Sequence, residues 1–145
     1  MINFQPPEPY LIDADVAKSL QEDIQTGDIT AALLNNDIEN GYIIAKQEAV
    51  ICGIPWVDAC FKFLDPDIQL NWLVAEGQHV AANTVVLKFR GKARALLSAE
   101  RSALNFLQTL SCTATQTAQL AKRLSHRITR VLDTRKTLPG LRLAQ

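Results

Sequence analysis

The sequence has few aromatic residues, no long apolar run and no sign of a secretory signal. Aromatic residues make up 6% of its 145 residues, and it has one methionine. Its longest apolar runs are a few residues long, whereas a helix that crosses a bilayer needs about 18 or more. Residues 1–7 show neither the basic nor the apolar region of a secretory signal. We therefore expect a cytoplasmic protein without a membrane span.

Cysteine and histidine are also too few for a disulfide framework or a zinc site. The three cysteines, Cys52, Cys60 and Cys112, are odd in number, and none forms a C-x-x-C pair. We expect each to be a small buried residue in a reducing compartment. His79 and His126 have no Cys, Asp or Glu at a repeated metal-ligand spacing. No residue of this chain is therefore predicted to bind a metal.

The net charge of zero hides a division between the two parts of the chain. Residues 1–87 hold 13 acidic and 3 basic residues, whereas residues 88–145 hold 2 acidic and 12 basic residues. The two net charges are therefore −10 and +10. A basic part can bind nucleic acid, bind small polyanions or dock on the acidic part. Only Phe89 and Phe106 accompany the basic residues, so a platform for stacking bases is poorly supported.

Apolar spacing predicts an α+β fold with several elements. The expected helices run from Asp13 to about residue 26, from Pro55 to Leu64, and from Ser98 to about residue 124, with strands at 42–50, 68–74, 85–89 and 128–132. Residues 76–87 also resemble the hammerhead of lipoyl and biotinyl carrier domains. However, the nearby Lys88 lies within a strand and not at a hairpin tip, which argues against a carrier function.

Two polar clusters could carry chemistry. On the long helix, Arg101, Asn105 and Gln108 fall on one polar face, where a guanidinium and an amide suit a planar carboxylate. Residues 133–137 follow the strand at 128–132, and α/β folds place ligands at the carboxyl ends of their strands. The alternatives are a solvated helix face and a surface turn in which Asp133 pairs with Lys136.

Together these segments resemble quinolinate phosphoribosyltransferase, the carboxylating nicotinate-nucleotide pyrophosphorylase. The resemblance covers essentially the whole chain and depends on four blocks: Glu22-Asp23 with Gly27-Asp28-Ile29-Thr30; Gly53 with Trp56; Glu100 to Phe106 with Leu110-Ser111; and Leu132 to Arg142. Cys112 departs from the family, which usually has glycine there.

The resemblance implies an open-faced sandwich with a hammerhead-like motif and helices over residues 1–112, followed at residues 113–145 by the first strand of a truncated α/β barrel. It also implies a homodimer or an assembly of dimers. A closed barrel takes roughly 200–250 residues. We therefore expect this chain alone to have little or no turnover.

The implied reaction is that of a pentosyltransferase in NAD biosynthesis. Quinolinate and phosphoribosyl pyrophosphate, bound with Mg²⁺, give nicotinate mononucleotide, pyrophosphate and CO₂. By resemblance, Arg101 reaches quinolinate in the neighbouring subunit, Thr134 and Arg135 also contact quinolinate, and Lys136 is a catalytic residue that faces both substrates. The protein contacts of Mg²⁺ are expected outside this chain, and neither nucleic acid nor a membrane is expected as a partner.

Three other interpretations remain open from the sequence. A molybdate-locus relative of this transferase would act on a different substrate. A binding module would hold nucleic acid on the basic part without chemistry. An orphan dimerisation domain would have no affinity for small anions.

Overall fold

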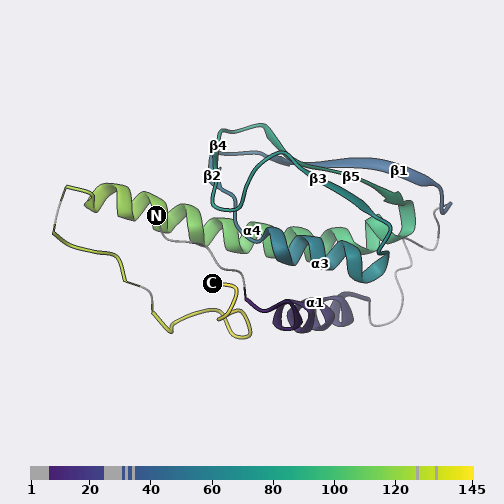
Figure 1. Cartoon of the computed structure of the whole chain (residues 1–145), viewed down its shortest axis with the longest axis horizontal. Coiled ribbons are helices and arrows are strands. Elements are labelled where there is room, and N and C mark those ends of the chain that lie inside the picture. The colour runs from purple at the N-terminus through teal and green to yellow at the C-terminus, as the bar shows by residue number, and fades with distance from the viewer. Residues whose placement is uncertain (1–6, 25–30, 32, 34, 127, 133) are drawn as a thin grey trace.

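The computed structural model describes residues 7–24, 31, 33, 35–126, 128–132 and 134–145. In these ranges a sheet, a pair of helices and a further helix lie in successive layers (Figure 1). The elements in chain order are α1 (Pro9–Ile24), β1 (Ile38–Ala45), β2 (Ala49–Val50), α3 (Ile54–Leu64), β3 (Gln69–Trp72), β4 (His79–Val80), β5 (Thr84–Lys92) and α4 (Ala93–Leu124). The expected α+β class is confirmed.

The main sheet has the order β1-β5-β3, and both of its strand pairs are antiparallel. Along β5, Leu87 is fully buried, while Lys88 and Arg90 alternate with the inward residues and are exposed. This is the pattern of a sheet with one face on a core. Gly41 lies opposite Phe89, and a Cβ at Gly41 would stand 2.3 Å from the phenyl ring, so no larger residue fits without a shift.

The core lies between this sheet and the helices. The first half of α4 supplies a buried apolar stripe, formed by Leu96, Ala99, Ala103, Phe106, Leu107 and Leu110. Beyond Leu110, Ala118 and Ala121 continue the three- to four-residue spacing of this stripe, but both are exposed. Figure 1 shows why: the end of α4 extends past the sheet and α3. The helix is anchored as far as Thr115, whose Oγ1 accepts a hydrogen bond from the backbone N–H of Val50 at 2.8 Å, and its last turns project.

The β2–β4 ladder forms the hammerhead-like part and is joined to α3 through Glu76. The Glu76 carboxylate accepts hydrogen bonds from the backbone N–H groups of Gly53 at 2.8 Å and Ile54 at 2.9 Å. An anion is favoured at this helix terminus because the unpaired N–H groups carry partial positive charge. Gly53 has a φ of 107°, a conformation that glycine adopts without strain. The carboxylate therefore fixes the turn onto the start of α3.

Several predicted boundaries differ from the structure. Helix α1 begins at Pro9, four residues before Asp13, because proline suits the first position of a helix. Helix α4 begins at Ala93 and not at Ser98, since Leu96 is already buried in the core. The strand expected over 42–50 is divided into β1 and β2.

The prediction of a buried strand at residues 128–132 is wrong. These residues form neither helix nor strand, and the exposed fractions of Ile128 and Leu132 are 102% and 79%. A strand needs a neighbour for its backbone hydrogen bonds. In the part of the chain that the structure describes, no strand is paired with this segment. Its apolar residues are therefore left in solvent.

The three cysteines differ in their burial. Burial raises the pKa of the Cys60 thiol to about 12, and burial with a hydrogen bond to Glu76 raises the pKa of Cys52 to about 12. The expectation of burial is confirmed for Cys60, whereas Cys52 is half-buried, and the expectation is wrong for Cys112, which is exposed. The Cys112 side chain therefore lies outside the core.

The described helices include none that is both long and apolar enough to cross a membrane.

Candidate functional site

Arg101 lies on the first half of α4 and points toward α1. Its Nη1 donates a hydrogen bond to Oδ1 of Asp23 at 2.6 Å. The side chain of Arg101 is 73% exposed, whereas that of Asp23 is 21% exposed. The guanidinium has five N–H donors in all. Most of this fork therefore faces solvent while one edge is held by the protein.

The position of Asp23 follows from the way α1 packs. Val16 and Leu20 are buried at four-residue spacing, so they hold α1 against the core. A polar row with the same spacing runs beside them. The Asp15 carboxylate accepts from Nε1 of Trp56 at 3.2 Å, and Ser19 Oγ donates to Ser102 Oγ at 3.0 Å. Asp23 is the third member of this row.

Sequence reasoning did not assign a role to Asp23. The available signal was the four-residue spacing of Asp15, Ser19 and Asp23, which is the same spacing as that of the apolar residues beside them. That spacing shows that the three polar side chains share a face. It does not show that the face meets α4, because that contact depends on the tertiary fold.

Asn105 and Gln108, the two residues predicted to share a polar face with Arg101, lie in different hollows of the surface. Asn105 and Gln108 are both exposed, as expected for a polar face. Asn105 lines a pocket of about 250 Å³ between α1, α4 and the segment after α4. Gln108 lines a different hollow of about 680 Å³, between α4 and the β1–β2 region. Only Asn105 therefore stays on the side of Arg101.

The residues predicted after the expected strand lie in an exposed irregular segment. Thr134, Arg135 and Lys136 are all exposed. The backbone N–H of Lys136 donates to Oγ1 of Thr134 at 3.2 Å, and Nη2 of Arg142 donates to the Arg135 carbonyl at 3.3 Å. Asp133, which the alternative interpretation paired with Lys136, lies outside the described residues. So do Gly27 to Thr30 of the first motif block.

The two strongest motif blocks meet in the pocket of about 250 Å³. Asn105 and Phe106 come from the block of Glu100 to Ser111, and Pro139, Gly140 and Leu141 come from the block of Leu132 to Arg142. Arg101 is not brought to residues 134–136 by this arrangement. Figure 1 shows the segment after α4 beneath the second half of the helix, whereas Arg101 belongs to the first half. The backbone of Arg101 and that of residues 134–136 therefore lie on different parts of the fold.

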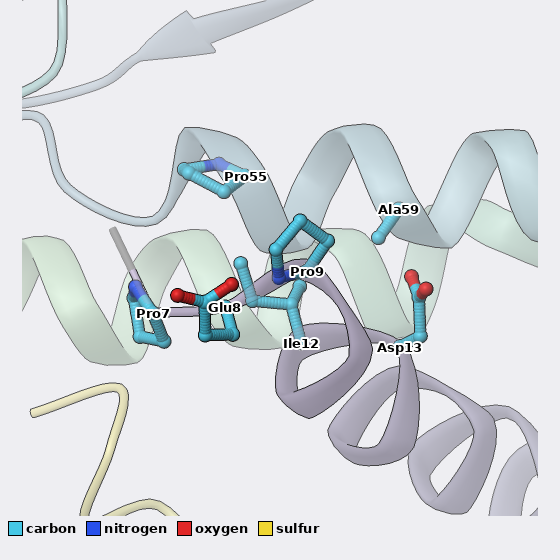
Figure 2. Close-up of a pocket in the computed structure, with 7 residues that line it drawn as sticks. All are labelled: Pro7, Glu8, Pro9, Ile12, Asp13, Pro55 and Ala59. Atoms are coloured by element: carbon cyan, nitrogen blue, oxygen red, sulfur yellow. The ribbon is translucent and has the colours of Figure 1, made fainter. Parts of the chain in front are cut away.

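A separate pocket lies between the N-terminal turn of α1 and the start of α3 (Figure 2). Its volume is about 390 Å³, and it is lined by Pro7, Glu8, Pro9, Ile12, Asp13, Pro55 and Ala59. Figure 2 shows the carboxylates of Glu8 and Asp13 on either side of Pro9 and Ile12. Two carboxylates and no cation make this pocket unsuitable for a polyanion. None of the predicted site residues lies in it.

Ion pairs also join the acidic and basic parts of the chain. Besides Arg101 with Asp23, Nζ of Lys92 lies 3.4 Å from Oδ2 of Asp65. Docking of one part on the other thus accounts for some of the charge division. Lys88, Arg135 and Lys136 remain exposed. Among the described residues, no three His, Cys, Asp or Glu side chains gather as metal ligands.

The sequence of this chain is similar to a known family model and to named proteins. A family model described as quinolinate phosphoribosyl transferase, N-terminal domain, matches residues 28–111. A Synechocystis protein named probable nicotinate-nucleotide pyrophosphorylase (carboxylating) is 39% identical over 140 residues, which cover 96% of this chain and 48% of that protein. An Arabidopsis thaliana chloroplastic protein of the same activity name is 35% identical, with 98% of this chain and 42% of that protein covered. The chain thus spans about half the length of these relatives.

Solved structures agree with this match. The nicotinate-nucleotide pyrophosphorylase from Francisella tularensis superposes with a TM-score of 0.92 at 41% identity, over 99% of this chain and 52% of that chain. A Streptococcus pyogenes structure superposes with a TM-score of 0.91 at 31% identity, over 97% of this chain and 51% of that chain. The likeness includes the exposed segment after α4, since nearly the whole chain is covered.

Proposed function

This chain belongs to the family described as quinolinate phosphoribosyl transferase, N-terminal domain, and from that premise we propose that it supplies one part of a carboxylating nicotinate-nucleotide pyrophosphorylase. The proposed substrates are quinolinate and phosphoribosyl pyrophosphate. The proposed contribution of this chain is to hold their negative charges with Arg101, Thr134, Arg135 and Lys136.

The observation that carries the proposal is the exposed guanidinium of Arg101. It is 73% exposed although Asp23 holds one of its edges. A planar fork that is fixed on one side and open on the other can bind both oxygens of a carboxylate. Quinolinate carries two adjacent carboxylates, so it needs cations from more than one direction. Arg135 and Lys136, exposed on a separate segment, are suited to be the second source.

The separation of these cations within one chain supports a shared site between two copies. In the proposed homodimer, or assembly of dimers, Arg101 of one subunit completes a pocket that contains residues 134–136 of the other. Each subunit would then contribute Arg101 to one site and residues 134–136 to another, so that groups held apart within one fold meet between two. We further propose a cytoplasmic location.

The proposed chemistry is a substitution at C1′ followed by decarboxylation. The lone pair of the quinolinate ring nitrogen forms a bond to C1′ while the C1′–oxygen bond breaks. The electron pair of the broken bond leaves with pyrophosphate. In the resulting pyridinium, the bond to the neighbouring carboxylate breaks, CO₂ departs, and the carbon takes up a proton. Fixed cations stabilise the charge that develops on pyrophosphate, and this is the role proposed for Lys136. The described residues offer no cluster of metal ligands, so no step is assigned to Mg²⁺, which is proposed to arrive with phosphoribosyl pyrophosphate.

A chimera tests the proposal. This chain would be joined to the remaining half of the Francisella tularensis relative, and formation of nicotinate mononucleotide would be measured. Activity is expected in the chimera and not in either half alone. Lys136→Ala should lower kcat by about 10²–10³, the usual effect of losing a group that stabilises transition-state charge. Lys122→Ala, which removes an exposed lysine from the end of α4, is the matched control.

Two outcomes would contradict the proposal. A folded chimera that leaves quinolinate unchanged would exclude this activity and would favour the molybdate-locus interpretation if another substrate were consumed. A chain that binds oligonucleotides tightly, with no competition from quinolinate, would favour the nucleic-acid-binding module.

A further inference from the structure

The ion pair between Arg101 and Asp23 is asymmetric. Its carboxylate is mostly sheltered and its guanidinium is mostly exposed, with exposed fractions of 21% and 73%. The two residues are 78 positions apart in sequence, so the contact exists only because α1 packs on α4. The pair therefore presents one partner to solvent and keeps the other within the fold.

Helix stability does not account for a carboxylate at this position. Asp23 lies in the last turn of α1, which ends at Ile24. The last carbonyl groups of a helix carry partial negative charge, so an aspartate there is unfavourable and a cation is preferred. No basic residue lies in that last turn. Exposed ion pairs also contribute little to folding stability.

We propose that Asp23 is a positioning residue that orients the guanidinium of Arg101 toward the ligand. This inference depends on the proposed function, because it concerns the substrate that Arg101 binds. Asp23 occupies Nη1, which leaves the other N–H groups of the fork for a quinolinate carboxylate. The contacts of Ser19 with Ser102 and of Asp15 with Trp56 keep α1, and with it Asp23, in a fixed place.

Two effects of Asp23 on binding have opposite signs, and this makes the inference testable. Its hydrogen bond orders the Arg101 side chain in advance, which favours binding of a carboxylate. Its negative charge repels a dianionic ligand, which disfavours binding. Asp23→Ala removes both effects. Asp23→Asn removes the charge but keeps an oxygen that can accept from Nη1.

The experiment measures the KM for quinolinate in the active chimera. Positioning predicts that Asp23→Ala raises this KM by about tenfold, the cost of ordering one long side chain on binding. Asp23→Asn should stay within about threefold of the parent, because the acceptor is retained. The KM for phosphoribosyl pyrophosphate should change less in both variants. Asp13→Ala, which removes an exposed carboxylate elsewhere on α1, is the control for charge alone.

Each other pattern overturns the inference. If both Asp23 variants lower the KM for quinolinate, then repulsion dominates and Asp23 does not position Arg101. If neither variant changes the KM while Arg101→Ala raises it, the ion pair is only structural. In both cases the parent chimera is active, so the proposed function stands. An inactive but folded parent chimera would overturn the proposed function and this inference together.

A second measurement uses the 145-residue chain as it exists. NMR of the Arg101 Nε–Hε group reports the order of the guanidinium. The group should be ordered in the parent and in Asp23→Asn, and mobile in Asp23→Ala. An Arg101 signal that is equally ordered in Asp23→Ala would overturn the inference without any assay of activity.

Discussion

Two regions of the molecule contain similar apolar side chains in opposite surroundings. In the body (residues 38–112), Phe61 and Leu87 have no exposed surface. In the terminal segment (residues 128–132 and 134–145), Ile128 and Leu132 are 102% and 79% exposed. Composition alone therefore does not decide which apolar residue is buried. A side chain is buried when the chain also supplies the elements that cover it.

The terminal segment is held to the rest of the molecule mainly near its end. Leu141 and Ala144 pack against the edge of the core, and Nε2 of Gln145 donates to Oγ1 of Thr113 at 3.0 Å. Between these contacts and α4, Thr134, Arg135 and Lys136 are exposed. Three of the four residues that the family resemblance assigns to substrate binding, Thr134, Arg135 and Lys136, thus lie in the less supported region, whereas Arg101 lies in the body.

The largest effect that would sharpen this comparison comes from a matched pair of leucine substitutions. Leu87→Ala should lower the free energy of unfolding by about 2–5 kcal/mol, because it leaves a cavity in a close-packed core. Leu132→Ala should change it by less than about 0.5 kcal/mol, since its side chain already faces solvent. Urea unfolding followed by circular dichroism measures both. Equal losses in the two variants would contradict the distinction between body and segment.

Much of the body could be predicted because its signals are local. Pro55 after Gly53 marks the start of α3, and the alternation around Leu87 marks β5 as a strand with one buried face. The strand expected at 128–132 failed for a non-local reason. Its apolar run is compatible with a buried strand, but burial needs neighbours that the described part of this chain does not provide.

The candidate site was predicted only where its features depend on local sequence. The exposure of Arg101 follows from its place on a polar helix face. Its contact with Asp23 joins residues distant in sequence, so no spacing within α4 predicts it. The separation of Asn105 from Gln108 likewise depends on which elements flank α4, and not on the helix alone.

A smaller effect concerns the response of the body to pH, where Asp65 and Asp58 should act in opposite directions. A hydrogen bond from the Asp67 backbone N–H, with help from Lys92, holds the pKa of Asp65 below its ordinary value of 3.8. Burial raises the pKa of Asp58 above 3.8, despite a hydrogen bond from Trp72. Asp65 therefore adds stability that is present above pH 3.8 and is lost as the pH falls through its lowered pKa. Asp58 does the reverse, and stability falls as the pH rises from 3.8 through its raised pKa.

Asparagine variants separate the two contributions. The destabilisation caused by Asp65→Asn should shrink as the pH falls below 3.8. Relative to the parent, Asp58→Asn should become more stable as the pH rises above 3.8, because it removes a half-buried charge and keeps an acceptor for Trp72. Urea midpoints between acid and neutral pH measure both. Parallel curves for parent and variants would show that neither carboxyl is coupled to folding.

The smallest effect tests how the terminal segment is attached. Thr113→Val removes the hydroxyl that accepts from Gln145, whereas Thr113→Ser keeps it. A single hydrogen bond is worth about 1 kcal/mol, so the valine variant should detach the segment more often without unfolding the body. Trypsin should then cut after Arg135 and Lys136 about two- to fivefold faster than in the parent, while the urea midpoint of the body changes little. The serine variant should be cut at the parent rate. If valine and serine are cut alike, Leu141 and Ala144 hold the segment without this hydrogen bond, and the support of the proposed substrate-binding residues is apolar and not polar.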